Sequence, residues 1–93
     1  MTILYLVRHG QTEWTQTGRH TSVTDLDLTE EGVAQARSLR DRLDPSRFDL
    51  VLSSPRLRAR RTAELAGFGD HEVHEDLAEW SYGEFEGLTS PQI

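Results

Sequence analysis

The stretch ILYLVRHG, residues 3–10, joins a run of five apolar residues to an arginine, a histidine and a glycine. The apolar run is rich in strand-forming residues and shows no polar alternation, which is typical of a strand buried on both faces of a parallel sheet. We therefore expect a buried strand over residues 3–7. Arg8 and His9 then stand at its carboxyl end.

Two helices and two further strands are predicted downstream. Thr29 is a good N-cap for a first helix, the acidic pair at 30 and 31 suits its positive end, and Asp44-Pro45 stops it. Its apolar stripe consists of Val33, Ala36, Leu39 and Leu43. Ser54 as N-cap and Pro55 as first residue predict a second helix that runs to about Ala66 and ends at Gly67. The strands are expected at 48–52 and 72–74.

The resulting order, strand-helix-strand-helix-strand, predicts an α/β fold with three α/β/α layers and a mainly parallel sheet. In such folds ligands bind beyond the carboxyl ends of the strands. Arg8 and His9 follow one strand and residues 53–58 follow another, so both segments should deliver basic residues to the same edge. Residues 11–28 are polar and irregular, and we expect a long functional loop there.

Composition limits the function further. The chain has 93 residues, a formal net charge of −6 and no cysteine. It makes at most one small domain, and its charge disfavours a nucleic-acid or membrane-surface binder. Disulfides and thiolate chemistry are excluded. The apolar run at 3–7 is too short for a signal peptide or a membrane span, so we expect a soluble, cytoplasmic protein.

His9 is a candidate nucleophile. An imidazole at the end of a buried strand can attack phosphorus if its proton state is fixed, and Arg8 offers a planar fork of donors for phosphate oxygens. Gly10 would let the backbone approach a substrate closely. Arg58 is a second candidate for phosphate binding, whereas Arg56, Arg60 and Arg61 are expected on a solvated helix face. The alternative for His9 is an ordinary local hydrogen bond at a strand end.

Five stretches in order resemble the histidine phosphatase superfamily, also called phosphoglycerate mutase-like. Arg8–Trp14 (RHGQTEW) resembles its signature heptad. The other four are Gly18–Thr21 (GRHT), Asp25–Gly32 (DLDLTEEG), Ser53–Pro55 with Arg58-Ala59 and Thr62-Ala63, and Leu77–Trp80 with Tyr82-Gly83 and Phe85–Gly87. The resemblance covers nearly the whole chain and is greatest to the acid phosphatase branch. It implies a phosphoglycerate mutase-like fold, of which residues 1–93 would be the N-terminal part of a single domain.

The resemblance also implies roles for individual residues. His9 would be phosphorylated, Arg8 and Arg58 would hold the phosphoryl oxygens, and Glu79 would be the general acid and later the base. A carboxyl in that role works best with a pKa raised by burial, for which Trp80, Tyr82 and Phe85 would form an apolar wall. The hydroxyls of Thr12 and Thr21 would face the substrate or serve as local turn or cap residues.

The family's pocket also uses a second histidine, usually before a glycine after a later strand, and none of the remaining histidines (His20, His71 and His74) has that setting. We expect no cofactor and no metal. His71 and His74 lie three positions apart, and such positions on a strand point to opposite faces, so the two rings could not chelate one ion together.

The superfamily contains hydrolases and mutases. Cofactor-dependent phosphoglycerate mutases typically carry Glu-Arg-His-Tyr-Gly around the acid and asparagine after the tryptophan of the heptad. Here residues 79–83 read EWSYG and Thr15 follows Trp14. This favours a phosphatase of small phosphate monoesters over a mutase, with a non-catalytic phosphate-binding or interaction module as a third hypothesis. The expected partner is a small phosphorylated metabolite, not nucleic acid or membrane, and a homodimer is left open.

Overall fold

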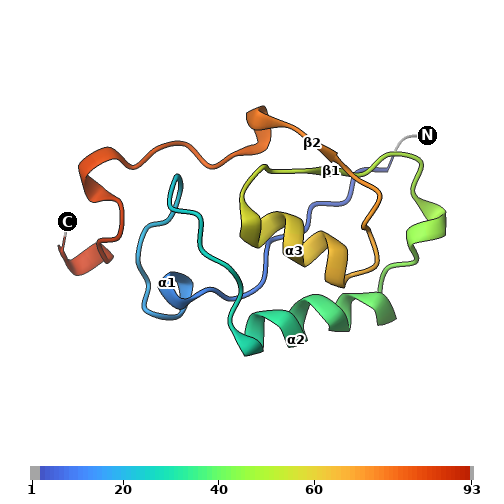
Figure 1. The fold of residues 1–93 in the computed structure, drawn as a ribbon, viewed down its shortest axis with the longest axis horizontal. Helices are drawn as coiled ribbons and strands as arrows, with labels where there is room; N and C mark the ends of the chain where they lie inside the picture. The colour runs from blue at the N-terminus through green and yellow to red at the C-terminus, as the bar shows by residue number, and fades with distance from the viewer. Residues whose placement is uncertain (1–2, 93) are drawn as a thin grey trace.

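The computed structural model describes residues 3–92, which form an elongated body of 43 × 27 × 20 Å (Figure 1). Three α-helices and two short strands make up its regular structure: α1 (Glu13–Gln16), α2 (Glu30–Ser38), β1 (Leu52–Ser53), α3 (Leu57–Leu65) and β2 (Glu72–Val73). Five 3-10 turns fill part of the remainder: η1 (Leu39–Asp41), η2 (Pro45–Arg47), η3 (Glu75–Leu77), η4 (Gly83–Phe85) and η5 (Ser90–Gln92).

The sheet within the described residues consists of β1 and β2, paired in parallel with Leu52 opposite Glu72 and Ser53 opposite Val73. Helix α3 connects the two strands, as the predicted strand-helix-strand order requires. In Figure 1 the sheet lies above α3, and α2 lies below α3. The parallel sheet and its crossover helix are therefore confirmed, on a smaller scale than predicted.

The strand predicted over residues 3–7 is wrong for this structure. These residues form no strand, and their side chains are exposed, Leu6 to 88%. A strand is defined by hydrogen bonds to a neighbour, and residues 3–7 pair with neither β1 nor β2. Side chains hold the segment instead, because Tyr5 packs edge-on against Phe48 at 5.1 Å between ring centroids. The strand predicted at 48–52 likewise shrinks to Leu52–Ser53.

Helix α2 begins where the sequence predicted. The side-chain oxygen of Thr29 accepts a hydrogen bond from the Gly32 N–H at 3.1 Å, and Glu30 and Glu31 occupy the first turn. Of the predicted apolar stripe, Ala36 is fully buried, and Val33, Leu39 and Leu43 are half-buried. The α-helix ends at Ser38 and continues as η1, before the Asp44-Pro45 stop.

Helix α3 begins two residues later than the predicted Pro55 start. Ser54 Oγ accepts from the Arg56 N–H at 3.3 Å, which keeps residues 54–56 in a turn. The first helical N–H, that of Leu57, donates to the carboxylate of Asp25 at 2.7 Å. A side chain from a distant loop therefore caps the helix, and nearby sequence could not reveal this cap.

The carboxyl end of α3 agrees with the prediction. Gly67 adopts φ +97°, which a residue with a side chain rarely tolerates. The Gly67 N–H donates to Glu64 O at 3.1 Å and the Phe68 N–H to Ala63 O at 2.8 Å. This pair of bonds is a Schellman motif, and it turns the chain back towards β2.

Residues 11–28 contain more order than the predicted loop. Thr12 caps α1, and Thr12 and Leu28 form an antiparallel bridge. Farther along, the segment 78–92 lies beside this loop (Figure 1). The His20 N–H donates to Leu88 O and the Gly87 N–H to His20 O, both at 2.8 Å. The loop is thus held from both of its sides.

Few apolar side chains are buried. Ala36 and Ala66 are the fully buried hydrophobic residues among residues 3–92, whereas Thr12, Ser22, Ser53, Arg58 and Thr62 are the buried polar ones. Polar contacts therefore hold the centre of this structure. None of the helices described is long and apolar enough to cross a membrane.

Candidate active site

His9 is half-buried, and a single hydrogen bond fixes the proton on its ring. Its Nδ1 lies 2.7 Å from the carbonyl oxygen of Gly10. A carbonyl oxygen only accepts, so Nδ1 must carry the proton and donate it. The lone pair of the neutral ring is then on Nε2. A nucleophilic histidine needs this tautomer, because the ring can then attack through the lone pair on Nε2.

The backbone beside His9 is held by both long helices. The Gly10 N–H donates to Thr62 Oγ1 of α3 at 2.9 Å. Gln11 is bound to α2, because its N–H donates to Gln35 Oε1 at 2.9 Å and its carbonyl accepts from the Thr29 N–H at 2.9 Å. His9 therefore stands on a backbone segment that is fixed at successive residues.

The missing side chain of Gly10 makes room for helix α2. A Cβ on Gly10 would lie 2.5 Å from the carbonyl oxygen of Gly32, in the first turn of α2. A Cβ on Gly32 would lie 2.1 Å from the carbonyl oxygen of Gln11. The two glycines therefore let the backbone after His9 contact α2 directly, and the predicted approach of a substrate to Gly10 stays a prediction.

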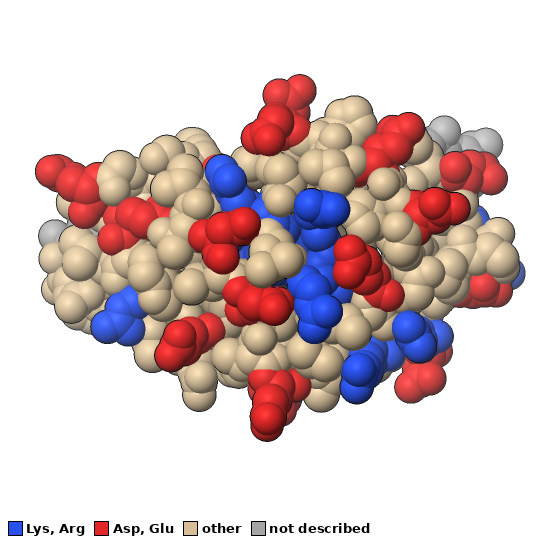
Figure 2. Space-filling model, viewed as in Figure 1, with Lys and Arg blue, Asp and Glu red and all other residues tan. Residues whose placement is uncertain are grey.

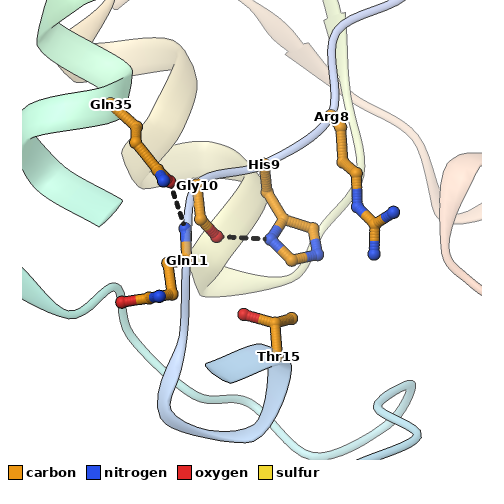
Figure 3. A pocket seen from close by; sticks show the side chains of 6 residues that line it. All are labelled: Arg8, His9, Gly10, Gln11, Thr15 and Gln35. Atoms are coloured by element: carbon orange, nitrogen blue, oxygen red, sulfur yellow. Dashed lines mark hydrogen bonds between the residues drawn. The ribbon is translucent and has the colours of Figure 1, made fainter. Parts of the chain in front are cut away.

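An open hollow of about 260 Å³ lies beside His9 and is lined by Arg8, His9, Gly10, Gln11, Thr15 and Gln35. Figure 3 shows the Arg8 side chain extending on the side of the His9 ring opposite to the Gly10 carbonyl, next to Nε2. A second hollow of about 230 Å³ shares Arg8 and His9 and extends to Arg42. The reactive nitrogen of His9 and the cationic Arg8 thus border the same space.

The pKa of His9 lies below its ordinary value of 6.5. Burial is the largest cause, since it disfavours the charged ring; the bond to Gly10 acts in the opposite direction. The charges of Arg58 and Arg8 lower the pKa further, and the charge of Glu79 raises it. Arg8, Arg58 and Glu79, the three residues that the family resemblance assigns to the site beside His9, therefore all act on the charge state of its ring.

We expect His9 to titrate below pH 6.5 in the folded protein, which can be measured by NMR of the histidine ring protons. A lowered pKa means that the neutral ring with its Nε2 lone pair persists as the pH falls through 6.5. Arg8→Gln removes one of the positive charges and should shift this titration upwards. A His9 titration above 6.5, or one insensitive to Arg8→Gln, would contradict this electrostatic account.

Arg58 is buried, and its guanidinium binds a loop. One terminal nitrogen donates to Thr24 O at 2.9 Å and the other to Ser22 O at 3.0 Å. Burial lowers the pKa of Arg58, and Arg56 adds to this, while Asp25, Glu86 and Glu79 raise it. A guanidinium stays charged and carries five N–H donors, of which two are used here, so others remain for an anion.

Glu79 lies near this group, but without the predicted apolar wall. Its side chain is exposed, and so is Trp80, to 78%. Its backbone is fixed, because Ser22 Oγ donates to Glu79 O at 2.6 Å. Tyr82 packs against His20 instead, with ring centroids 5.0 Å apart. The burial expected for the carboxyl group is therefore not provided by the described residues.

The two threonines are engaged locally. Thr12 is fully buried and caps α1, with its Oγ1 accepting from the Thr15 N–H at 3.2 Å. Thr21 Oγ1 donates to Arg19 O at 3.1 Å. Of the two alternatives that the sequence left open, both residues adopt the turn or cap arrangement in this structure.

The remaining arginines of α3 are only partly solvated. Arg60 is exposed as predicted, whereas Arg56 and Arg61 are half-buried, and Arg61 approaches Asp27 at 3.4 Å. In Figure 2 arginines gather at the middle of one face, over α3, in a protein whose net charge is −6. Such a local concentration of positive charge suits an anionic ligand.

Glu86 is the residue that sequence reasoning missed. Its Oε2 accepts from the N–H groups of Ser22 at 2.9 Å and Thr24 at 3.1 Å. Burial raises its pKa, but these donors and the charge of Arg58 outweigh the burial and hold the pKa below its ordinary value. The only sequence signal was its place in the FEG stretch, which does not indicate its partners.

The described residues contain no group of three or more His, Cys, Asp or Glu side chains arranged for a metal ion. The His71 ring bonds to Phe68 O at 2.7 Å, and His74 Nε2 lies 3.3 Å from Glu72 Oε2. The structure therefore combines His9, whose lone pair is on Nε2, with Arg8 at one hollow, while Arg58 and Glu79 act on the His9 ring through their charges. These groups can accept an anionic phosphoryl group and exchange protons.

Comparison with known proteins adds three findings. The profile of the histidine phosphatase superfamily (branch 1) matches residues 4–93. An acid phosphatase from Mycobacterium tuberculosis is 48% identical over 92 residues, which are 97% of this chain and 45% of the relative. The sedoheptulose 1,7-bisphosphatase of Saccharomyces cerevisiae is 38% identical over 104 residues, covering 95% of this chain and 38% of the relative.

Among solved structures, phosphoglycerate mutase from Thermus thermophilus superposes with a TM-score of 0.80 at 45% identity. The match covers 92% of this chain and 48% of that one. The chain thus spans less than half the length of each of these relatives. The likeness confirms the predicted α/β, phosphoglycerate mutase-like fold class.

Proposed function

Because the chain belongs to the histidine phosphatase superfamily, branch 1, we propose that it takes part in hydrolysing small phosphate monoesters through a phosphohistidine on His9. The resemblance inferred from the five sequence motifs is thereby confirmed, and relatives named as phosphatases and as a mutase share the fold. The observation that carries the proposal is the bond from His9 Nδ1–H to Gly10 O, which leaves the lone pair on Nε2.

In the first step of this proposal, Nε2 of His9 attacks phosphorus. The N–P bond forms while the bond between phosphorus and the ester oxygen breaks, and the carboxyl group of Glu79 gives its proton to the leaving oxygen. Arg8 and Arg58 balance the charge of the phosphoryl oxygens throughout the transfer. The positive charges of both arginines lower the pKa of His9, and Arg8 also lines the hollow beside the ring, which supports this role.

In the second step, water attacks the phosphohistidine. The Glu79 carboxylate takes a proton from the water, the N–P bond breaks, and inorganic phosphate leaves with the lone pair restored to Nε2. Glu79 then carries the proton that the next substrate needs. All protons are accounted for by one carboxyl group and one water molecule.

A phosphatase is favoured over a mutase by the residue beside Glu79. Mutases typically carry an arginine at this position, where a cation can hold a second phosphate or a carboxylate, and this chain has Trp80. The Trp80 ring is exposed and neutral. A substrate with a single phosphate is therefore the better match.

We expect a phosphorylated His9 to be trapped during turnover of a generic aryl phosphate in the presence of a chelator. The reaction of the full-length protein is stopped under alkaline denaturing conditions, because phosphohistidine is labile in acid. The phosphorylated peptide is then mapped by mass spectrometry. Phosphate on another residue, or activity that strictly requires a divalent ion, would refute the proposal.

A second assay, with 3-phosphoglycerate as the substrate, separates the alternatives. Conversion of 3-phosphoglycerate to 2-phosphoglycerate faster than phosphate release would identify a mutase. Binding of phosphate esters with no phosphohistidine and no turnover would identify a non-catalytic phosphate-binding module.

A further inference from the structure

A three-residue loop, Ser22–Thr24, lies between Glu86 and Arg58. On one side, the N–H groups of Ser22 and Thr24 both donate to Glu86 Oε2, at 2.9 and 3.1 Å. On the other side, the carbonyl groups of the same two residues accept from Arg58, at 3.0 and 2.9 Å. Glu86 and Arg58 therefore contact the same two residues of the chain through opposite polar groups.

This arrangement transmits position from the carboxylate to the guanidinium. The N–H and the carbonyl of Ser22 flank one Cα, and so do those of Thr24. They belong to successive planar peptide groups that only two dihedral angles separate, so a shift of the N–H groups displaces the neighbouring carbonyls. Arg58 itself is buried and forms no ion pair with any carboxylate among residues 3–92.

The second oxygen of Glu86, Oε1, indicates that the carboxylate is oriented to bind the loop 22–24. Its Oε1 is buried and has no hydrogen-bond partner within the described part of the chain. A carboxylate in the surface layer normally turns both oxygens to water, and an unpaired buried oxygen costs free energy. Glu86 is held in that orientation while Oε2 accepts two backbone donors. A carboxylate that only interacts with water at the surface would not need this orientation.

We infer that Glu86 is a positioning residue. By binding the backbone N–H groups of residues 22 and 24, it fixes the position of the Arg58 guanidinium, which binds the carbonyls of the same residues. The inference rests on the proposed function, in which Arg58 holds phosphoryl oxygens. Glu86 touches no substrate in this scheme. Its effect on catalysis passes entirely through the loop and Arg58.

A double-mutant cycle on the protein at its natural length tests this inference. Glu86→Ala should lower kcat/KM for an aryl phosphate by roughly 10- to 100-fold, the scale of a misplaced catalytic contact. If Glu86 acts through Arg58, Arg58→Ala combined with Glu86→Ala should be no slower than Arg58→Ala alone, within about threefold. Inorganic phosphate should inhibit Glu86→Ala and Arg58→Ala more weakly, in parallel. Losses that multiply in the double variant would overturn the inference.

Two further variants separate positioning from folding. Glu86→Gln retains an oxygen that can accept both N–H groups, so it should recover most of the activity that alanine removes, whether or not Glu86→Ala folds. Equal losses for glutamine and alanine would count against this positioning role. Glu84→Ala, an exposed glutamate two residues away, should leave kcat/KM unchanged. If His9→Ala is fully active, the proposed function fails; if it is inactive but the cycle multiplies, only this inference fails.

Discussion

His9→Ala should lower kcat for phosphate-ester hydrolysis by about 10⁴-fold or more, the scale seen when a covalent nucleophile is removed. The expectation follows from one geometric fact: Nδ1 is committed to the Gly10 carbonyl at 2.7 Å, so Nε2 is the only ring atom left to attack. Alanine removes that atom and leaves Arg8 and Arg58 in place. Steady-state kinetics with an aryl phosphate, together with the loss of the trapped phosphoprotein, would measure the effect.

His71→Ala is the matched control for this experiment. Its ring also bonds through Nδ1 to a carbonyl, that of Phe68 at 2.7 Å, but it belongs to the segment that leads into β2 and lines neither hollow beside His9. The control should keep its full rate. Binding of inorganic phosphate should persist in His9→Ala, because the arginines that hold it remain. A residual rate within tenfold of the parent would show that His9 is not the nucleophile.

The parts of the fold that the sequence predicted are those that depend on nearby residues. The side chain of Thr29 caps α2 by accepting a hydrogen bond from the N–H of Gly32, three positions later. Gly67 ends α3 through a bond to Glu64, also three positions away. Such contacts span only a few residues, so residue type and spacing suffice to identify them. The start of α3 was predicted too early because its cap, Asp25, lies 32 positions away from Leu57.

Strands depend on partners that local sequence cannot supply. Residues 3–7 have the composition of a buried strand, but a strand needs a neighbouring segment that hydrogen-bonds to it in register. No described segment pairs with residues 3–7. The pair β1 and β2 was predicted more accurately, because a single short crossover through α3 fixes both strands.

The candidate site residues came from the family motifs. Of them, Arg8, Arg58 and Glu79 each act on the pKa of His9, and Glu79 also acts on that of Arg58. Glu86 was not predicted, because a carboxylate that accepts from backbone N–H groups more than 60 positions away leaves no mark in spacing. Gly32 gave a weak sequence signal. A glycine in the first turn of a predicted helix lowers helix stability, and a close backbone contact is a reason for its presence there.

The close contact at Gly32 predicts the second large effect, on stability. In most helices, replacing glycine by alanine is favourable by about 0.5–1 kcal/mol, because alanine loses less backbone entropy on folding. Here a Cβ would stand 2.1 Å from the carbonyl oxygen of Gln11 and 2.9 Å from its nitrogen, well inside contact distance. Both obstructing atoms belong to the backbone, which cannot rotate away as a side chain would.

Gly32→Ala should therefore destabilise the protein by about 2 kcal/mol or more, the upper part of the range for overpacked cores. Gly69→Ala is the control, since a Cβ there meets nothing within 4 Å, and its effect should stay within about 0.5 kcal/mol. Urea unfolding of both variants measures the difference in free energy. The Gln11 backbone that must move is continuous with His9, so Gly32→Ala should also lower kcat in the fraction that remains folded. A variant as stable and active as its parent would mean that α2 does not press on the backbone after His9.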